Sequence, residues 1–182
     1  MIIHTFLNHP KNQKSQFIND GFIKIENFWP EELIHDWDKT IVAFYHQQAL
    51  KISYLRKNFS KGLDPLAYDS VNDLDKVLLL LEKEDKQTGY QASIMCENSV
   101  AQRKLLTHPP FVEACSILLN CNEKLLNYSA GTPFVNIPSS KRLLYRWHTE
   151  ASYYPKRKNF LNVWFPMFRA KTKDNGTMFF EI

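Results

Sequence analysis

The spacing of apolar residues changes after Cys121, and this change constrains the fold more than any other feature of the chain. Before it, apolar residues recur at helical spacing. After it, short apolar segments alternate with turn residues, of which Asn175-Gly176 is the strongest turn signal. Helices followed by consecutive short strands predict an α+β protein. The expected strands are residues 124–128, 133–137, 143–150, 160–168 and 177–182.

The part before Cys121 predicts helices with defined ends. Gly21 suits the end of a short helix over 15–20, and Pro30 suits the first turn of a helix running to about Leu50. A short strand is expected between them, over 22–25. Further helices are predicted over 73–85, with a solvated outer face, over 99–107, and from Pro110 to near Asn120. The apolar stripe predicted for the helix after Pro30 is Leu33, Trp37, Ile41, Phe44 and Tyr45.

Length and composition limit the class of protein. A chain of 182 residues with 44% hydrophobic residues predicts one domain, over 1–182, with a sizeable core. There is no apolar run of about 18 residues, so no membrane span is expected. Three cysteines without zinc-site spacing indicate reduced thiols in a cytoplasmic protein. The net charge of +4 is mild, and no nucleic-acid-binding motif accompanies it.

One expected strand, 143–150, carries a pair of metal-ligand side chains. Side chains two residues apart on a strand share a face, so His148 and Glu150 would project into the same space. Together they supply two-thirds of a 2-His-1-carboxylate iron site. Arg146 falls on the same face, either as part of the site or as an ion-pair partner of Glu150. The basic residues around this pair either attract an anionic cosubstrate or belong to solvated loops.

A second expected strand, 160–168, carries two further candidate site residues. Asn162 and Trp164 alternate onto one face. An Asn on a buried face needs hydrogen-bond partners, so it could face a bound cosubstrate. Trp164 is either a wall of that pocket or an ordinary core aromatic residue.

With these residues in view, the chain resembles the phytanoyl-CoA dioxygenase family of Fe(II)- and 2-oxoglutarate-dependent oxygenases. Four passages carry the resemblance: 17–37, 108–119, Trp147-His148-Thr149-Glu150, and Asn162 to Pro166 followed by Asn175-Gly176-Thr177-Met178. It implies a double-stranded β-helix, or jelly roll, that begins at about residue 121 after a helical part over 1–120. It also implies Fe(II) held by His148 and Glu150, with 2-oxoglutarate bound beside Trp164. Asn162 and Arg146 are further candidates for the cosubstrate site because of the faces on which alternation places them.

The activity implied by the resemblance is hydroxylation of a small-molecule or lipid-like substrate with 2-oxoglutarate and dioxygen. Two departures qualify it. The family more often has Asp where this chain has Glu150, which keeps a carboxylate ligand and argues against a halogenase. The family's distal His and Arg would follow Ile182, so the sequence reads as a copy of the domain whose barrel is incomplete at the C-terminus. The alternative is a catalytically inactive jelly-roll fragment that acts as a binding or interaction module.

Overall fold

The computed structural model describes residues 9–25, 28–51, 74, 77–79, 81, 83, 86–128 and 159–165 of the chain. These residues divide between two compact units. Unit 1 contains the described residues of 9–34, 105–128 and 159–165, and unit 2 contains those of 35–104. The prediction that 1–182 forms a single domain stays a prediction.

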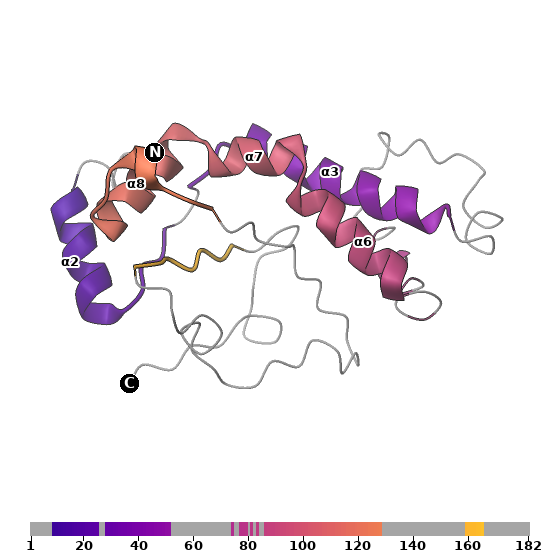
Figure 1. The fold of residues 1–182 in the computed structure, drawn as a ribbon, viewed down its shortest axis with the longest axis horizontal. Coiled ribbons are helices and arrows are strands. Elements are labelled where there is room, and N and C mark those ends of the chain that lie inside the picture. The colour runs from indigo at the N-terminus through magenta and orange to yellow at the C-terminus, as the bar shows by residue number, and fades with distance from the viewer. Residues whose placement is uncertain are drawn as a thin grey trace. The chain divides into compact units, whose positions relative to one another are not determined.

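Unit 1 is built on two short helices, α2 (Pro10–Asp20) and α8 (Pro109–Leu119), which pack against each other (Figure 1). Each begins with proline, whose fixed φ suits the first turn and whose missing N–H would have had no partner there. α2 ends at Gly21, where φ is 75°, and the Gly21 N–H donates to the Phe17 carbonyl at 3.0 Å. The Lys14 ammonium donates to Asn120 Oδ1 at 2.8 Å, which links α2 to the end of α8.

The core of unit 1 is a small aromatic cluster. Phe28, Phe111, Ala114 and Cys115 are buried in it. The chain around it contributes partly buried side chains: Ile23, Ile25, Trp29, Leu106, Ile117, Leu118, Leu126, Tyr128 and Leu161. Because these residues come from sequence positions far apart, the cluster joins α8 to segments that are neither helix nor strand.

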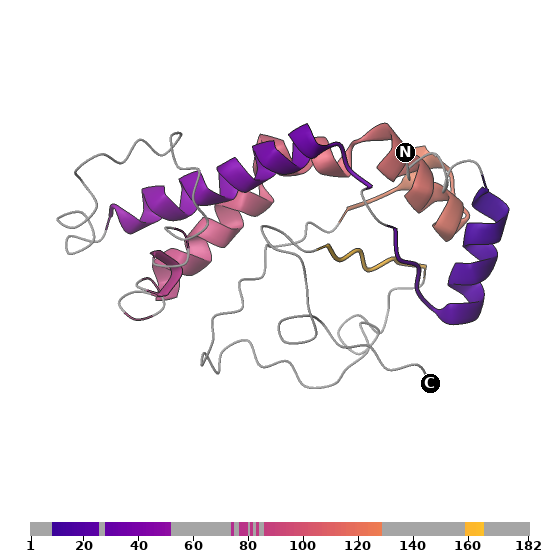
Figure 2. The ribbon, with the colours of Figure 1, turned by 180° about the vertical axis from the view of Figure 1, so that it is seen from behind.

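Unit 2 contains most of α3 (Glu31–Ala49), all of α6 (Lys86–Glu97) and the start of α7 (Val100–Leu106). α3 and α6 lie side by side in both views (Figures 1 and 2). Trp37, Ile41 and Tyr45 form the buried stripe of α3, and Ala92 and Cys96 are buried on α6. The helices also share a polar contact, because the hydroxyl groups of Tyr45 and Ser93 lie 2.7 Å apart.

The predicted fold class is contradicted. Of the described residues, 71% are helical, and these residues contain no β-strand, sheet or barrel. The double-stranded β-helix expected from about residue 121 is therefore wrong for the part of the chain that the structure describes. The expected strands over 133–137, 143–150 and 177–182 lie outside the described residues.

The expected strands that can be checked show why the prediction failed. Residues 22–25 alternate as a strand would, with Ile23 and Ile25 inward and Phe22 outward, but they pack on the helical cluster without belonging to a ladder. Residues 123–125 form a 3-10 turn, η1 (Glu123–Leu125), capped by the Asn122 side chain, which accepts from the Lys124 N–H at 2.9 Å. Residues 160–165 form no ladder with other described residues. Apolar alternation indicates an extended chain, whereas a sheet also needs a neighbouring strand.

Most of the predicted helices are confirmed. α2, α3, α7 and α8 confirm the four predicted helices to within a few residues, apart from the earlier start of α2 at Pro10. In the predicted 73–85 helix, the described residues are helical, and Leu79 is exposed as expected of an outer face. That helix also has a buried face, made of Leu74, Val77, Leu78 and Leu81. α6 was not predicted at all.

None of the helices in the described ranges combines the length and the apolar character that crossing a bilayer requires.

Candidate functional site

The five predicted site residues fall in two places. His148, Glu150 and Arg146 lie outside the described residues, whereas Asn162 and Trp164 lie in the described segment 159–165. Among the described residues, no group of three or more His, Cys, Asp and Glu side chains is arranged to hold a metal ion. The proposed metal pair is therefore considered below through its chemistry alone.

The segment 159–165 is fixed to the core of unit 1 at two points. Leu161 packs against the aromatic cluster, and the Phe165 ring lies 4.6 Å from the Trp29 ring, centroid to centroid. Trp29 is itself held in place, because its indole N–H donates to the Leu105 carbonyl at 3.2 Å and its ring lies 5.3 Å from that of Phe111. Because Leu161 and Phe165 are both held against the core, the three residues between them face outward.

Asn162, Val163 and Trp164 are those outward residues. Trp164 is 50% exposed and Val163 46% exposed, and Asn162 is exposed as well. Three consecutive exposed residues do not follow the strict alternation expected of a strand. The reading of Trp164 as an ordinary core aromatic residue does not fit its half-exposed ring. An exposed indole can stack on a planar ligand, and an exposed amide two residues away can hydrogen-bond to one.

A group of titratable side chains that sequence reasoning did not single out lies at the end of α8. Burial raises the pKa of Cys115 to about 11, with a smaller part of that rise coming from Cys121. Burial also raises the pKa of Tyr128, with Cys115 and Glu123 adding to the effect. The Tyr128 hydroxyl is buried without a hydrogen-bond partner in the structure. The six-residue spacing of the two cysteines was the available signal.

His108 marks the other end of α8. Its carbonyl accepts from the N–H groups of Phe111 and Val112, at 2.9 and 3.1 Å, which starts the helix. Its Nδ1 is buried and has no hydrogen-bond partner in the structure.

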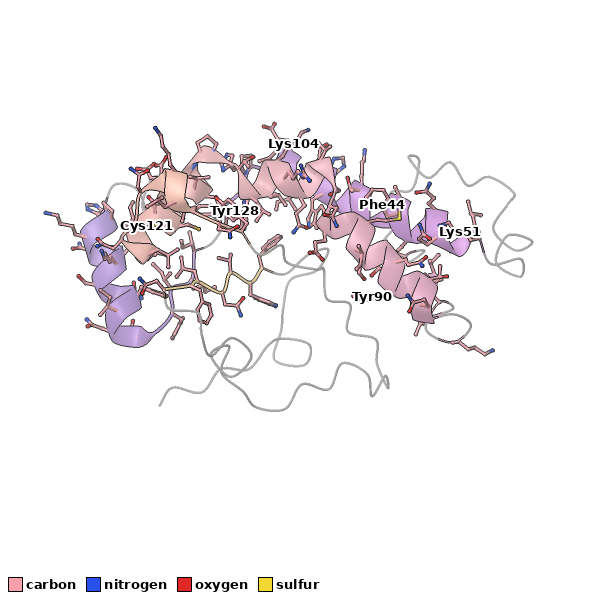
Figure 3. The ribbon with its side chains drawn as sticks, viewed as in Figure 1. Phe44, Lys51, Tyr90, Lys104, Cys121 and Tyr128 are labelled. Atoms are coloured by element: carbon pink, nitrogen blue, oxygen red, sulfur yellow. The ribbon has the colours of Figure 1, made fainter. Side chains whose placement is uncertain are left out.

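Unit 2 contains two features of its own. Burial raises the pKa of Asp38, on α3, to about 6, against a smaller opposing effect of His35. A shallow cavity of about 300 Å³ opens between the end of α3 and α6, near Lys51 and Tyr90 (Figure 3). Its other lining residues are Gln48, Gln87, Gln91, Ile94 and Met95. The Gln48 amide donates to the Met95 sulfur at 2.7 Å.

The comparisons with known proteins give no family. No protein-family model, curated protein or solved structure matches the chain. The function must therefore be argued from the chemistry of the residues themselves.

Proposed function

We propose that this protein is an Fe(II)- and 2-oxoglutarate-dependent dioxygenase that hydroxylates a small-molecule or lipid-like substrate. The observation that carries the proposal is the sequence Trp147-His148-Thr149-Glu150. It supplies an imidazole and a carboxylate two residues apart, which are the ligand types that non-haem Fe(II) takes in a facial triad. The proposal depends on this ligand chemistry and does not require a jelly roll.

The roles proposed for the other candidate residues follow from the charge and shape of 2-oxoglutarate. Fe(II) held by His148 and Glu150 would supply the chemistry for oxidative decarboxylation of 2-oxoglutarate and hydroxylation of the substrate. Trp164 offers a flat apolar surface, Asn162 an amide for hydrogen bonding, and Arg146 a cation for a carboxylate. The outward presentation of Asn162 and Trp164 on an anchored segment is consistent with ligand contact. We do not assign a nucleic-acid partner.

We place this function in the cytoplasm. The three cysteines, Cys96, Cys115 and Cys121, are free thiols in the structure. Free thiols fit a reducing compartment, where Fe(II) is also maintained.

The first test is metal binding measured without turnover. Under anaerobic conditions, Fe(II) should bind the wild-type protein stoichiometrically and raise its melting temperature. His148→Ala and Glu150→Ala should each weaken binding by more than about 100-fold, beyond the upper end for changes to outer-shell residues. His35→Ala is the matched control, because it removes an exposed imidazole from α3 and should leave iron binding unchanged.

The second test is 2-oxoglutarate turnover, followed as succinate formation in the presence of Fe(II) and dioxygen. The wild-type protein should form succinate, and His148→Ala should not. Iron binding that persists in both ligand variants would refute the assignment of the metal pair. Tight iron binding without any succinate formation would instead support a metal site at His148 and Glu150 and contradict the proposed dioxygenase activity.

A second candidate function is a binding or interaction module without catalysis. It is favoured by the exposed apolar side chains of Val163 and Trp164, since apolar surface of this kind marks interaction sites when it is contiguous. Absence of both iron binding and succinate formation in the wild-type protein would select this candidate over the dioxygenase.

A further inference from the structure

The chain reverses direction at the end of α8 and turns Cys121 back towards the helix that carries Cys115. Asn120 adopts the left-handed conformation, with a φ of 53°. The Asn120 N–H donates to the Ile117 carbonyl at 3.3 Å, and the Cys121 N–H donates to the Ser116 carbonyl at 3.0 Å. These two bonds define a Schellman motif, which folds the residue after the cap back over the last helical turn.

In that motif, the side chain after the cap commonly contacts one of two residues near the helix end, which here are Ser116 and Cys115, so Cys121 is turned back towards the part of α8 that carries Cys115. Cys121 lies at the end of α8 (Figure 3). Cys121 contributes to the raised pKa of Cys115, which agrees with this placement of the two side chains. Both are free thiols, and they differ in access, because Cys115 is 7% exposed whereas Cys121 is partly exposed.

We propose that Cys115 and Cys121 form a reversible disulfide when the protein meets a small-molecule disulfide such as oxidised glutathione. Transient disulfides of this kind are the form in which cytoplasmic proteins sense oxidation. The fold positions the two cysteines for this reaction, because the cap hydrogen bonds fix the backbone at the end of α8 before either sulfur reacts.

The reaction proceeds in two exchange steps. The more accessible Cys121 loses its proton to solvent and attacks one sulfur of glutathione disulfide, which forms a mixed disulfide and releases one glutathione thiolate. Cys115 then loses its proton and attacks the Cys121 sulfur, which closes the protein disulfide and releases the second glutathione thiolate. Both thiolates take up protons. The two protein thiols are oxidised, and one glutathione disulfide is reduced to two molecules of glutathione.

The test is mass mapping of the native protein after equilibration in glutathione redox buffers. Trypsin cleaves after Lys104 and Lys124, so Cys115 and Cys121 lie in the single peptide 105–124. That peptide should lose the mass of two hydrogen atoms and carry no glutathione. Cys96 is the internal control, because it lies in the separate peptide 87–103, is fully buried, and should remain a free thiol.

Two further measurements make the result specific to the fold. In Cys115→Ala, no second thiol can resolve the mixed disulfide, so glutathione should remain on Cys121. In urea, the ratio of disulfide to dithiol should fall by about tenfold or more at the same buffer composition, because the cap no longer holds the pair.

Three results would overturn the proposal. The first is stable glutathione on Cys121 of the wild-type protein, which would mean that Cys115 does not resolve it. The second is a dithiol peptide that stays reduced throughout the buffer series. The third is a disulfide that forms as readily in urea as in the native protein, which would mean that the fold contributes nothing to the pairing.

Discussion

At the scale of single residues, Asp38 carries the clearest energetic consequence. Burial raises its pKa from 3.8 to about 6, and its Oδ1 is buried without a hydrogen-bond partner in the structure. The folded protein therefore binds this proton more tightly than the unfolded chain does. The resulting stability is fully present below about pH 4 and is lost as the pH rises through about 6.

Asp38→Asn should accordingly stabilise the protein at neutral pH. The carboxyl is only about half buried, so we expect a gain of about 1 kcal/mol at pH 7, which corresponds to roughly 2–4 °C in melting temperature. The gain should shrink as the pH falls towards 4 and vanish below about pH 3, where the wild-type carboxyl is protonated in both states. Melting temperatures measured across this pH range provide the check.

The matched control for this prediction is Asp36→Asn, on the exposed side of the same helix. It removes an equal charge and an exposed ion pair with Lys104, at 3.3 Å, of a kind that contributes little to stability. It should leave the loss of stability between about pH 4 and 6 in place. If the melting temperature depends on pH in the same way in wild type and Asp38→Asn, Asp38 is not the source of that pH dependence.

At the scale of secondary-structure elements, two glycines have opposite roles. Gly21 ends α2 with a φ of 75°, a conformation that strains any residue with a Cβ. Gly89 lies within α6, where a Cβ would meet the Leu81 Cβ at 3.8 Å, an ordinary van der Waals distance. The same substitution should therefore change stability in opposite directions at the two positions.

We expect Gly21→Ala to lower the free energy of unfolding by about 1 kcal/mol, because alanine is strained in the left-handed conformation. Gly89→Ala should raise that free energy by roughly 0.5–1 kcal/mol, because alanine favours the interior of a helix. Urea denaturation of the two variants beside wild type measures both changes. A Gly89→Ala protein less stable than wild type would mean that α6 has no room for the methyl group beside Leu81.

At the scale of the whole molecule, the balance of helix and sheet is the property to measure. The five described α-helices alone make up about a third of the chain. Far-UV circular dichroism of the native protein should therefore show at least that proportion of helix. The signal should disappear in denaturant. A spectrum with strong β-structure and little helix would contradict the architecture described above.

The sequence by itself determined the ends of most helices, because those ends depend on neighbouring residues. Pro30, Gly21 and Asn120 each mark a boundary through their own backbone preferences. The stripe of Trp37, Ile41 and Tyr45 on α3 follows from spacing within one element. The candidate metal pair was likewise identified from local sequence, and only the chemistry of His148 and Glu150 supports it.

The tertiary structure decided what depends on partners distant in sequence. The extended segment 22–25 packs on helices where the sequence suggested a strand, since alternation does not specify a neighbour. α6 was not predicted, and its buried residues, Ala92 and Cys96, are defined by packing against other segments of the chain. The outward position of Trp164 depends on anchors at Leu161 and Phe165. Such contacts arise only when separate segments share one core, which no local pattern encodes.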